Sequence, residues 1–150
     1  MSDDSVIVYD ANNMVAGRLA SKVAKAALLG KNVVVANAEK AIITGDRDTV
    51  VRAYKEKFNI RTSYNPRKGP FHNRRPDKML RRIIRGMLPY PKPRGKKAFK
   101  RIQVYMGMPH EYEEEDKVVL EGSKYRSLTM KYITISDLCH ELGWRNPEVA

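Results

Sequence analysis

The first forty residues carry the pattern that most restricts the fold of this chain. Residues 6–9 are a β-branched run, and residues 33–36 read Val-Val-Val-Ala, a continuous apolar run typical of a strand that is buried on both faces. Between them, from Val15 to Leu29, apolar residues recur at a helical period, and Gly30 follows as the expected C-cap. A strand, a helix and a strand in this order predict a right-handed βαβ unit with parallel strands, and therefore an α/β fold.

Further elements extend this unit toward the C-terminus. Periodicity and turn residues predict strands at 41–44, 102–106 and 132–135, helices at 48–59 and 77–88, a short basic helical turn after Gly95, and a last helix that Ser136 caps and Gly143 closes. The sequence contains no internal repeat and no composition break, so we expect residues 1–150 to form a single domain.

The positive charge is concentrated in the middle of the chain. The formal net charge is +12, and residues 61–101, here called the basic segment, hold 15 of the 29 Lys and Arg residues but only one acid, Asp77. The basic segment therefore has a net charge of +14, whereas the other 109 residues, with 14 cations and 16 acids, have a net charge of −2. A dense cluster of one sign repels itself, so this pattern predicts a polyanionic partner for the basic segment rather than an ordinary solvated face.

Within the basic segment, the predicted helix at 77–88 is amphipathic. Leu80, Ile83, Ile84 and Met87 fall on one face, and the opposite face carries Lys78, Arg81, Arg82 and Arg85. Arginine can hold a phosphate with two parallel hydrogen bonds or stack on an unpaired base, which indicates RNA as the polyanion.

The segments that flank this helix supply more candidate RNA-binding residues. The loop at 62–76 is rich in Pro, Gly, Asn and Arg and has too few apolar residues to pack by itself, so we expect it to be poorly ordered until it is bound. Tyr64, Phe71, His72 and Tyr90 lie among the cations and are suited either to stacking on bases or to local packing. The remaining candidates are Arg61, Arg67, Lys68, Arg74, Arg75, Gly86, Lys92, Arg94, Gly95, Lys96, Lys97, Lys100 and Arg101.

A second, smaller set of cations lies on the first predicted helix. Arg18, Lys22 and Lys25 are spaced i, i+4 and i+7, which places them on one side, opposite the apolar stripe. This spacing suits either contact with a phosphate backbone or simple solubilisation of the helix.

Support for an enzyme is weak. The turn before the first helix, residues 12–17, lacks the glycine-rich phosphate loop of nucleotide-binding sites. Asp10 and Glu39 are near expected strand ends, where ligands bind in open α/β sheets, but two such carboxylates are common by chance. His72, His110, Cys139 and His140 show no metal-ligand spacing. We therefore expect no catalytic residues, no metal, no cofactor and no small-molecule substrate.

The chain is also unlike a membrane or secreted protein. Its N-terminus is acidic rather than basic, no stretch approaches 18 uninterrupted apolar residues, and its one cysteine, Cys139, cannot form an internal disulfide. We expect a cytoplasmic protein that does not associate with membranes.

Several motifs together resemble one family. The segment Ile84-Arg85-Gly86-Met87-Leu88-Pro89, then Gly95-Lys96, then Ile102-Gln103-Val104-Tyr105-Met106-Gly107 is similar to the signature of the large-subunit ribosomal protein L-thirteen family. Other matching positions are Asp10, residues 17–21, Ala24-Lys25, Gly30, residues 37–40 and Gly45. Residues 69–74 and 138–144 resemble its archaeal and eukaryotic branch, so the likeness extends from about Val6 to Trp144.

The resemblance implies a three-layer α/β/α fold with a mostly parallel four-stranded sheet, to which the basic loop and helix are added. It also implies binding to large-subunit rRNA, contact with neighbouring proteins of the large subunit, a role in early subunit assembly, and no enzymatic residues. We do not expect the chain to form homo-oligomers. Two alternatives stay open: a free RNA-binding regulator of translation, and an RNA-modifying or nucleotide-dependent enzyme.

Overall fold

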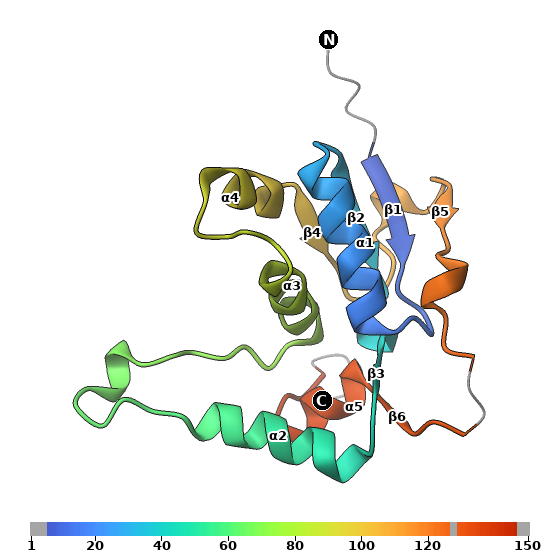
Figure 1. The fold of residues 1–150 in the computed structure, drawn as a ribbon. Coiled ribbons are helices and arrows are strands. Elements are labelled where there is room, and N and C mark those ends of the chain that lie inside the picture. Colours follow the sequence, from blue (N-terminus) through green and yellow to red (C-terminus); the bar gives the residue numbers. More distant parts are fainter. Residues whose placement is uncertain (1–5, 127–128, 147–150) are drawn as a thin grey trace.

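The centre of the fold is the predicted βαβ unit (Figure 1). The computed structural model describes residues 6–126 and 129–146; the acidic N-terminus discussed above lies outside this range. Strand β1 (Val6–Asp10) and strand β2 (Asn32–Ala36) are parallel neighbours, and helix α1 (Ala16–Leu28) connects them. Gly30 follows α1 with φ = +99° and donates its N–H to the carbonyl oxygen of Ala27 at 3.1 Å, which confirms it as the residue that ends this helix.

Four parallel strands form the main sheet, in the order β4-β2-β1-β5. Strand β4 (Ile102–Val104) pairs with β2, and strand β5 (Lys117–Val118) pairs with β1. The α/β class and the mostly parallel four-stranded sheet are therefore confirmed. The sequence did not indicate β5, because it is two residues long and follows an acidic run that reads as a surface loop.

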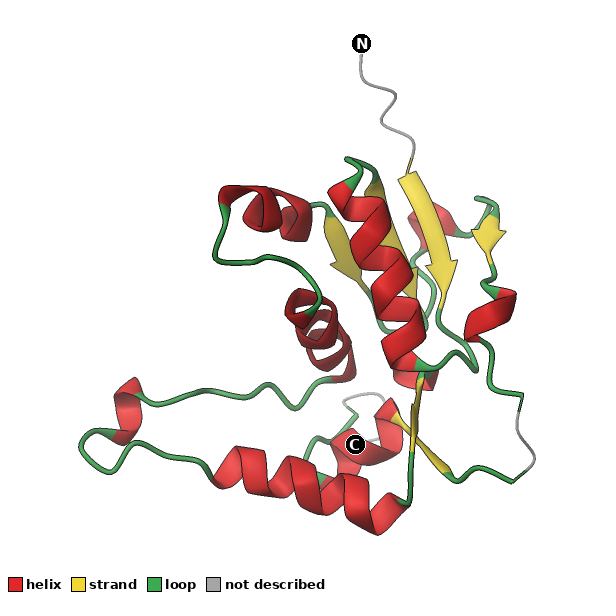
Figure 2. Ribbon diagram, in the orientation of Figure 1, coloured by secondary structure: helices red, strands yellow, loops and turns green. Residues whose placement is uncertain are grey.

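Both faces of this sheet are covered. Val33 is fully buried in the core cluster with Leu19 and Val23 of α1, which lies in front of the strands in Figure 2. Val8 and Val34 alternate to the opposite face and are only 1% and 3% exposed. On that far side, the chain between β4 and β5 passes behind the strands and includes a short 3-10 helix at 110–112 (Figure 2).

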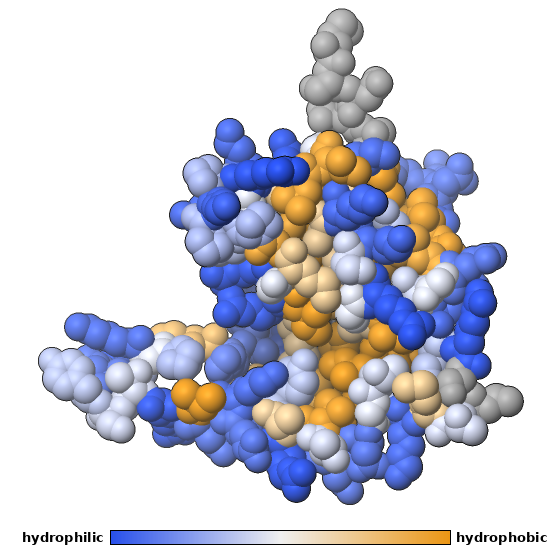
Figure 3. Space-filling view, viewed as in Figure 1, coloured by the Kyte–Doolittle hydropathy of each residue, from blue (hydrophilic) through white to orange (hydrophobic). Residues whose placement is uncertain are grey.

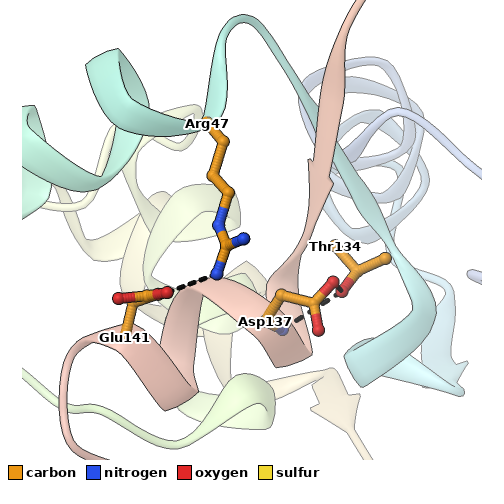
Figure 4. A network of polar contacts seen from close by, with 4 residues as sticks. All are labelled: Arg47, Thr134, Asp137 and Glu141. Carbon is orange, nitrogen blue, oxygen red and sulfur yellow. Dashed lines mark hydrogen bonds and ion pairs between the residues drawn. The ribbon is translucent and has the colours of Figure 1, made fainter.

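A second, two-stranded sheet lies beside the main one. Strand β3 (Ile42–Thr44) pairs antiparallel with strand β6 (Tyr132–Thr134), and β6 runs directly into helix α5 (Ile135–Glu141). The expectation that Ser136 caps this last helix was wrong. The cap is Thr134, whose Oγ1 accepts a hydrogen bond from the Asp137 N–H at 3.1 Å and donates one to the Asp137 carboxylate at 2.7 Å (Figure 4). With no loop between strand and helix, the capping residue is the last residue of the strand.

Helix α2 (Arg47–Asn59) follows β3 and is tied to α5. Arg47 at its first turn forms an ion pair with Glu141 near the end of α5 (Figure 4). Gly143 follows α5 with φ = +91° and donates its N–H to the carbonyl oxygen of His140 at 2.9 Å, so the predicted ending at Gly143 is confirmed.

Helices α3 (Pro76–Gly86) and α4 (Pro93–Lys100) both pack against α1. The predicted apolar face of α3 needs one correction: Met79 is buried, whereas Met87 is 42% exposed. The helix ends at Gly86 because Leu88 precedes Pro89, which disfavours helical backbone at the residue before it. Met87 therefore lies beyond the helix and does not follow its periodicity.

Among the described residues, every helix is too short or too polar to span a membrane.

Candidate nucleic-acid interface

The predicted cations of the basic segment lie on three consecutive structural parts. The first is the stretch at 60–75, here called the projecting loop, which extends away from the rest of the molecule between α2 and α3 (Figure 1). The other two are the outer face of α3 and helix α4 with the turn before it. Three of these cations are half-buried, namely Arg81, Arg85 and Arg101, and the rest are exposed, namely Arg61, Arg67, Lys68, Arg74, Arg75, Lys78, Arg82, Lys92, Arg94, Lys96, Lys97 and Lys100.

Little of this charge is neutralised inside the protein. Asp77 is the one acid of the basic segment, and it forms an ion pair with Arg75, Nη2 to Oδ2 at 3.2 Å. The other ion pairs between described residues lie outside the segment and include Arg47–Glu141 and Lys131–Asp46. The basic segment thus presents a surface of one sign, as the charge count predicted.

Figure 3 shows mostly hydrophilic residues over the region of α3 and α4, while hydrophobic residues gather in a band over α1. A polyanion that approaches α3 and α4 meets several basic groups at once.

Two arginines of α3 are held in place by aromatic rings. The guanidinium carbon of Arg85 lies 3.7 Å from the centre of the Tyr90 ring, and that of Arg81 lies 4.5 Å from the centre of the Phe99 ring. The two rings contact each other edge to face, with centres 5.5 Å apart. Tyr90 therefore packs locally, and the stack joins α3 to α4 and restricts both arginines by cation–π attraction.

The two candidate glycines differ in their structural role. An added Cβ at Gly95 would lie 2.1 Å from the carbonyl oxygen of Pro89, so α4 can approach the 89–90 turn only because residue 95 has no side chain. An added Cβ at Gly86 would have no heavy atom within 4 Å. Packing within the protein therefore requires glycine at 95 but not at 86.

The projecting loop has a few internal supports. The Asn65 side chain accepts a hydrogen bond from the Arg67 N–H at 3.0 Å and so begins a short 3-10 helix, residues 66–68. His72 packs on Phe58 of α2, with ring centres 5.2 Å apart. In contrast, Tyr64 and Phe71 are 90% and 80% exposed, so these two rings are available for contact with bases.

The cations of α1 do not all join the basic surface. Arg18, Lys22 and Lys25 are exposed, as their spacing predicted. Lys25 lines the same shallow hollow as Arg94 of α4, which brings it to the basic surface. Arg18, at the other end of α1, donates to the carbonyl oxygen of Gly122 at 3.4 Å and so contacts the body of the protein instead.

Helix α2 also lies beside the candidate interface, which its own sequence does not indicate. Tyr54, Lys57 and Phe58 of α2 line a hollow of about 480 Å³ together with the end of the projecting loop and α3. The charges of α2 are of mixed sign, as is typical of an ordinary solvated face, and only the return of the chain against this helix forms the hollow. No local sequence signal could have identified it.

The two carboxylates that could have suggested an active site hold loops together. Asp10 Oδ1 accepts hydrogen bonds from the Asn12 N–H at 3.0 Å and from the Asn37 side-chain amide at 2.9 Å. Glu39 accepts one from the Gly107 N–H at 3.1 Å. Across the part of the chain that the structure describes, no three His, Cys, Asp or Glu side chains lie close enough to bind a metal ion.

Comparison with known proteins places this chain in a family. Residues 4–111 match the family model described as Ribosomal protein L13. The large ribosomal subunit protein uL13 of Methanocaldococcus jannaschii is 44% identical over 137 residues, which cover 91% of this chain and 96% of that protein. The proteins of the same name from Methanopyrus kandleri and Archaeoglobus fulgidus are 45% and 40% identical, covering 93% and 95% of this chain and 88% and 90% of their own lengths. The chain therefore belongs to the ribosomal protein L13 family.

Proposed function

We propose that this protein is a structural constituent of the large ribosomal subunit, where it binds large-subunit rRNA through the basic segment and supports early subunit assembly. The relatives that cover nearly the whole chain are named as large-subunit proteins. One structural observation carries the RNA-binding part of the proposal: 15 cations and a single, ion-paired acid occupy residues 61–101.

The mechanism is neutralisation of phosphates by a surface that is already folded. Exposed cations of α3 and α4 approach phosphate oxygens from a helical scaffold, while Arg81 and Arg85 are held against aromatic rings before RNA arrives. A rigid cationic surface that contacts two RNA segments fixes their separation. In this way a small protein assists the folding of a large RNA.

No enzymatic activity is part of this proposal. The carboxylates nearest the strand ends, Asp10 and Glu39, accept hydrogen bonds from loop groups of the protein itself. Tight binding of a nucleotide or a methyl donor by the purified protein would contradict this view and favour an RNA-modifying enzyme.

A salt titration tests the phosphate contacts. If roughly 6–10 phosphates are neutralised, the affinity for large-subunit rRNA should fall about 10³–10⁵-fold between about 50 and 200 mM salt, because bound cations release counterions from the RNA. A binding isotherm that does not depend on salt would contradict the proposed mechanism.

Sedimentation separates a ribosomal constituent from a free regulator of translation. We expect most of the protein to sediment with large subunits after a high-salt wash of a cell extract. If most of it stays in the slowly sedimenting fractions, the free RNA-binding regulator becomes the better explanation.

A further inference from the structure

The hollow of about 480 Å³ beside α3 has walls of two chemical kinds. Residues from α2 and from 70–73 of the projecting loop supply aromatic and apolar groups, and α3 supplies most of the charge. The described residues that line it include four cations and no acid: Lys57, Lys78, Arg82 and Arg85. A ligand that suits this hollow combines a flat apolar part with a negative charge.

The aromatic wall is partly fixed and partly open. The His72 ring packs against Phe58 of α2, with ring centres 5.2 Å apart, and the guanidinium carbon of Arg74 lies 5.6 Å from the centre of the same Phe58 ring. Phe71, the next residue in the loop, also lines the hollow but is 80% exposed. A flat group that enters the hollow can therefore contact an aromatic face without displacing the protein's own packing.

The charged wall is formed by one face of α3. Lys78 and Arg82 are spaced i and i+4, so they lie one turn apart on the same side of the helix, and both are exposed at the hollow. The acid of this helix, Asp77, is ion-paired with Arg75. Lys78 and Arg82 are therefore positioned to bind a phosphate group at the rim.

We propose that this hollow receives one unpaired nucleotide of the bound RNA, with its base against Phe71 and His72 and its phosphate against Lys78 and Arg82. A paired base is covered by its neighbours in the duplex and cannot present a face to a ring, whereas a bulged or looped-out base can. The inference rests on the proposed function and adds a preference for single unpaired nucleotides, which phosphate neutralisation alone does not provide.

Three short RNA hairpins with the same stem test this proposal. One carries a single bulged adenosine, the second carries an abasic residue at the same place, and the third is fully paired. We expect the full-length protein to bind the bulged hairpin about tenfold more tightly than either of the others, the size expected when one base stacks on an aromatic side chain. Fluorescence anisotropy of end-labelled hairpins measures the three affinities.

Substitutions of Phe71 and of a neighbouring exposed residue test the stacking contact. F71A should remove the preference for the bulged adenosine, and F71W should keep it, because Trp also offers a stacking face. I60A is the control, since Ile60 lies in the same loop at 61% exposure but does not line the hollow. Neither alanine variant removes a buried group, so both should fold normally.

The outcomes distinguish this inference from the proposed function. Equal binding of the bulged and abasic hairpins, or an unchanged preference in F71A, overturns the nucleotide site. If all three hairpins then bind equally with steep salt dependence, the phosphate-binding function survives without the site. If no hairpin binds in a salt-dependent way, both proposals fail together.

Discussion

The projecting loop and the α3–α4 surface both carry positive charge but are supported in different ways. None of residues 60–75 is buried, and the loop is supported by local turns and by the contact of His72 with Phe58. The α3–α4 surface covers a buried apolar face that includes Met79, Leu80 and Ile84. Cations that lie on a packed helix are held in place by the core beneath them. The loop cations lack this support, so we expect the loop to become fully ordered only when RNA binds.

This difference has an energetic consequence for RNA binding. Fixing the backbone of one residue costs about 1–2 kcal/mol of conformational free energy, and a loop that becomes ordered on binding loses that amount from its gross interaction with RNA. The cations of α3 and α4 avoid this cost because folding has already ordered their backbone. We therefore expect each helical cation to contribute more net affinity than each loop cation.

Charge reversal in matched sets tests this comparison and should give the largest effect. The helical set changes Lys78, Arg82, Lys96 and Lys97 to Glu, and the loop set changes Arg61, Arg67, Lys68 and Arg74 to Glu. We expect the helical set to weaken rRNA binding by about 100-fold or more and to reduce the slope of log affinity against log salt by about 3, since each phosphate contact contributes about 0.7–0.9. The loop set should have a clearly smaller effect.

A third set controls for net charge. Lys31, Lys40, Arg52 and Lys55 are exposed residues outside the basic segment, and their reversal changes the net charge by the same amount. This control should leave rRNA binding close to wild type. Equal losses in all three sets would mean that total charge, rather than its placement, controls binding, and a larger loss in the loop set would reverse the comparison.

The two glycines provide the next test, which separates packing from RNA contact. G95A places a Cβ 2.1 Å from the Pro89 carbonyl oxygen, so we expect it to destabilise the fold by about 1–3 kcal/mol and to displace α4 with its cations. G86A meets no heavy atom within 4 Å and should leave stability unchanged or improve it by about 0.5–1 kcal/mol, because Ala suits a helix better than Gly. Urea unfolding measures both values.

The RNA affinity of G86A then carries separate information. If G86A is stable yet binds rRNA more weakly, RNA approaches the backbone closely at residue 86, which would support Gly86 as a candidate RNA-binding residue. If G86A binds normally and G95A alone is impaired, only Gly95 is required, because it lets α4 approach the 89–90 turn.

Much of this architecture follows from periodicity in the sequence. The β1-α1-β2 unit, the position of α2 and the ending at Gly30 were predicted from local patterns, because a buried β-branched run and a helical stripe each identify their own structure. Strand β5 was not predicted, because two residues are too few to show the alternation of a strand. The Thr134 cap was missed because β6 passes into α5 without the loop that usually marks a helix start.

The candidate site was likewise predictable from the sequence only in part. Charge counting identified the basic segment, since counting needs no knowledge of tertiary contacts. The stacking of Arg81 on Phe99 and the participation of Phe58 depend on which helices become neighbours. Arg81 and Phe99 are 18 positions apart in the sequence, and Phe58 lies on a different helix from the α3 residues that line the same hollow. No local sequence pattern encodes such contacts.

A smaller effect is expected from loss of the stacked geometry while the charge is kept. R85K keeps the cation but loses the planar group that lies 3.7 Å from the Tyr90 ring, so we expect a loss of about 0.5–1 kcal/mol in stability and a few-fold weaker RNA binding. R82K is the matched control, because Arg82 is an exposed arginine of the same helix. Thermal unfolding compares the two; an equal fall in Tm for both variants would show that the ring contact of Arg85 has no special weight.

The weakest expected effect is also a check on all the others, because it reports whether α3 stays packed. Burial raises the pKa of the Cys139 thiol from 9.0 to about 12, with a further contribution from the nearby Asp77 carboxylate, and the Cys139 sulfur lies 3.9 Å from the sulfur of Met79 on α3. The folded state therefore favours the neutral thiol, so its contribution to stability is complete below about pH 9 and falls as the pH rises from about 9 toward 12.

At pH 8 we expect a thiol reagent to label Cys139 slowly in the native protein and rapidly in urea. The helical charge-reversal variant should retain this slow labelling if its loss of RNA binding comes from charge alone. Rapid labelling in that variant would show that α3 had left the core. Its weaker RNA binding could then not be used to compare helical cations with loop cations.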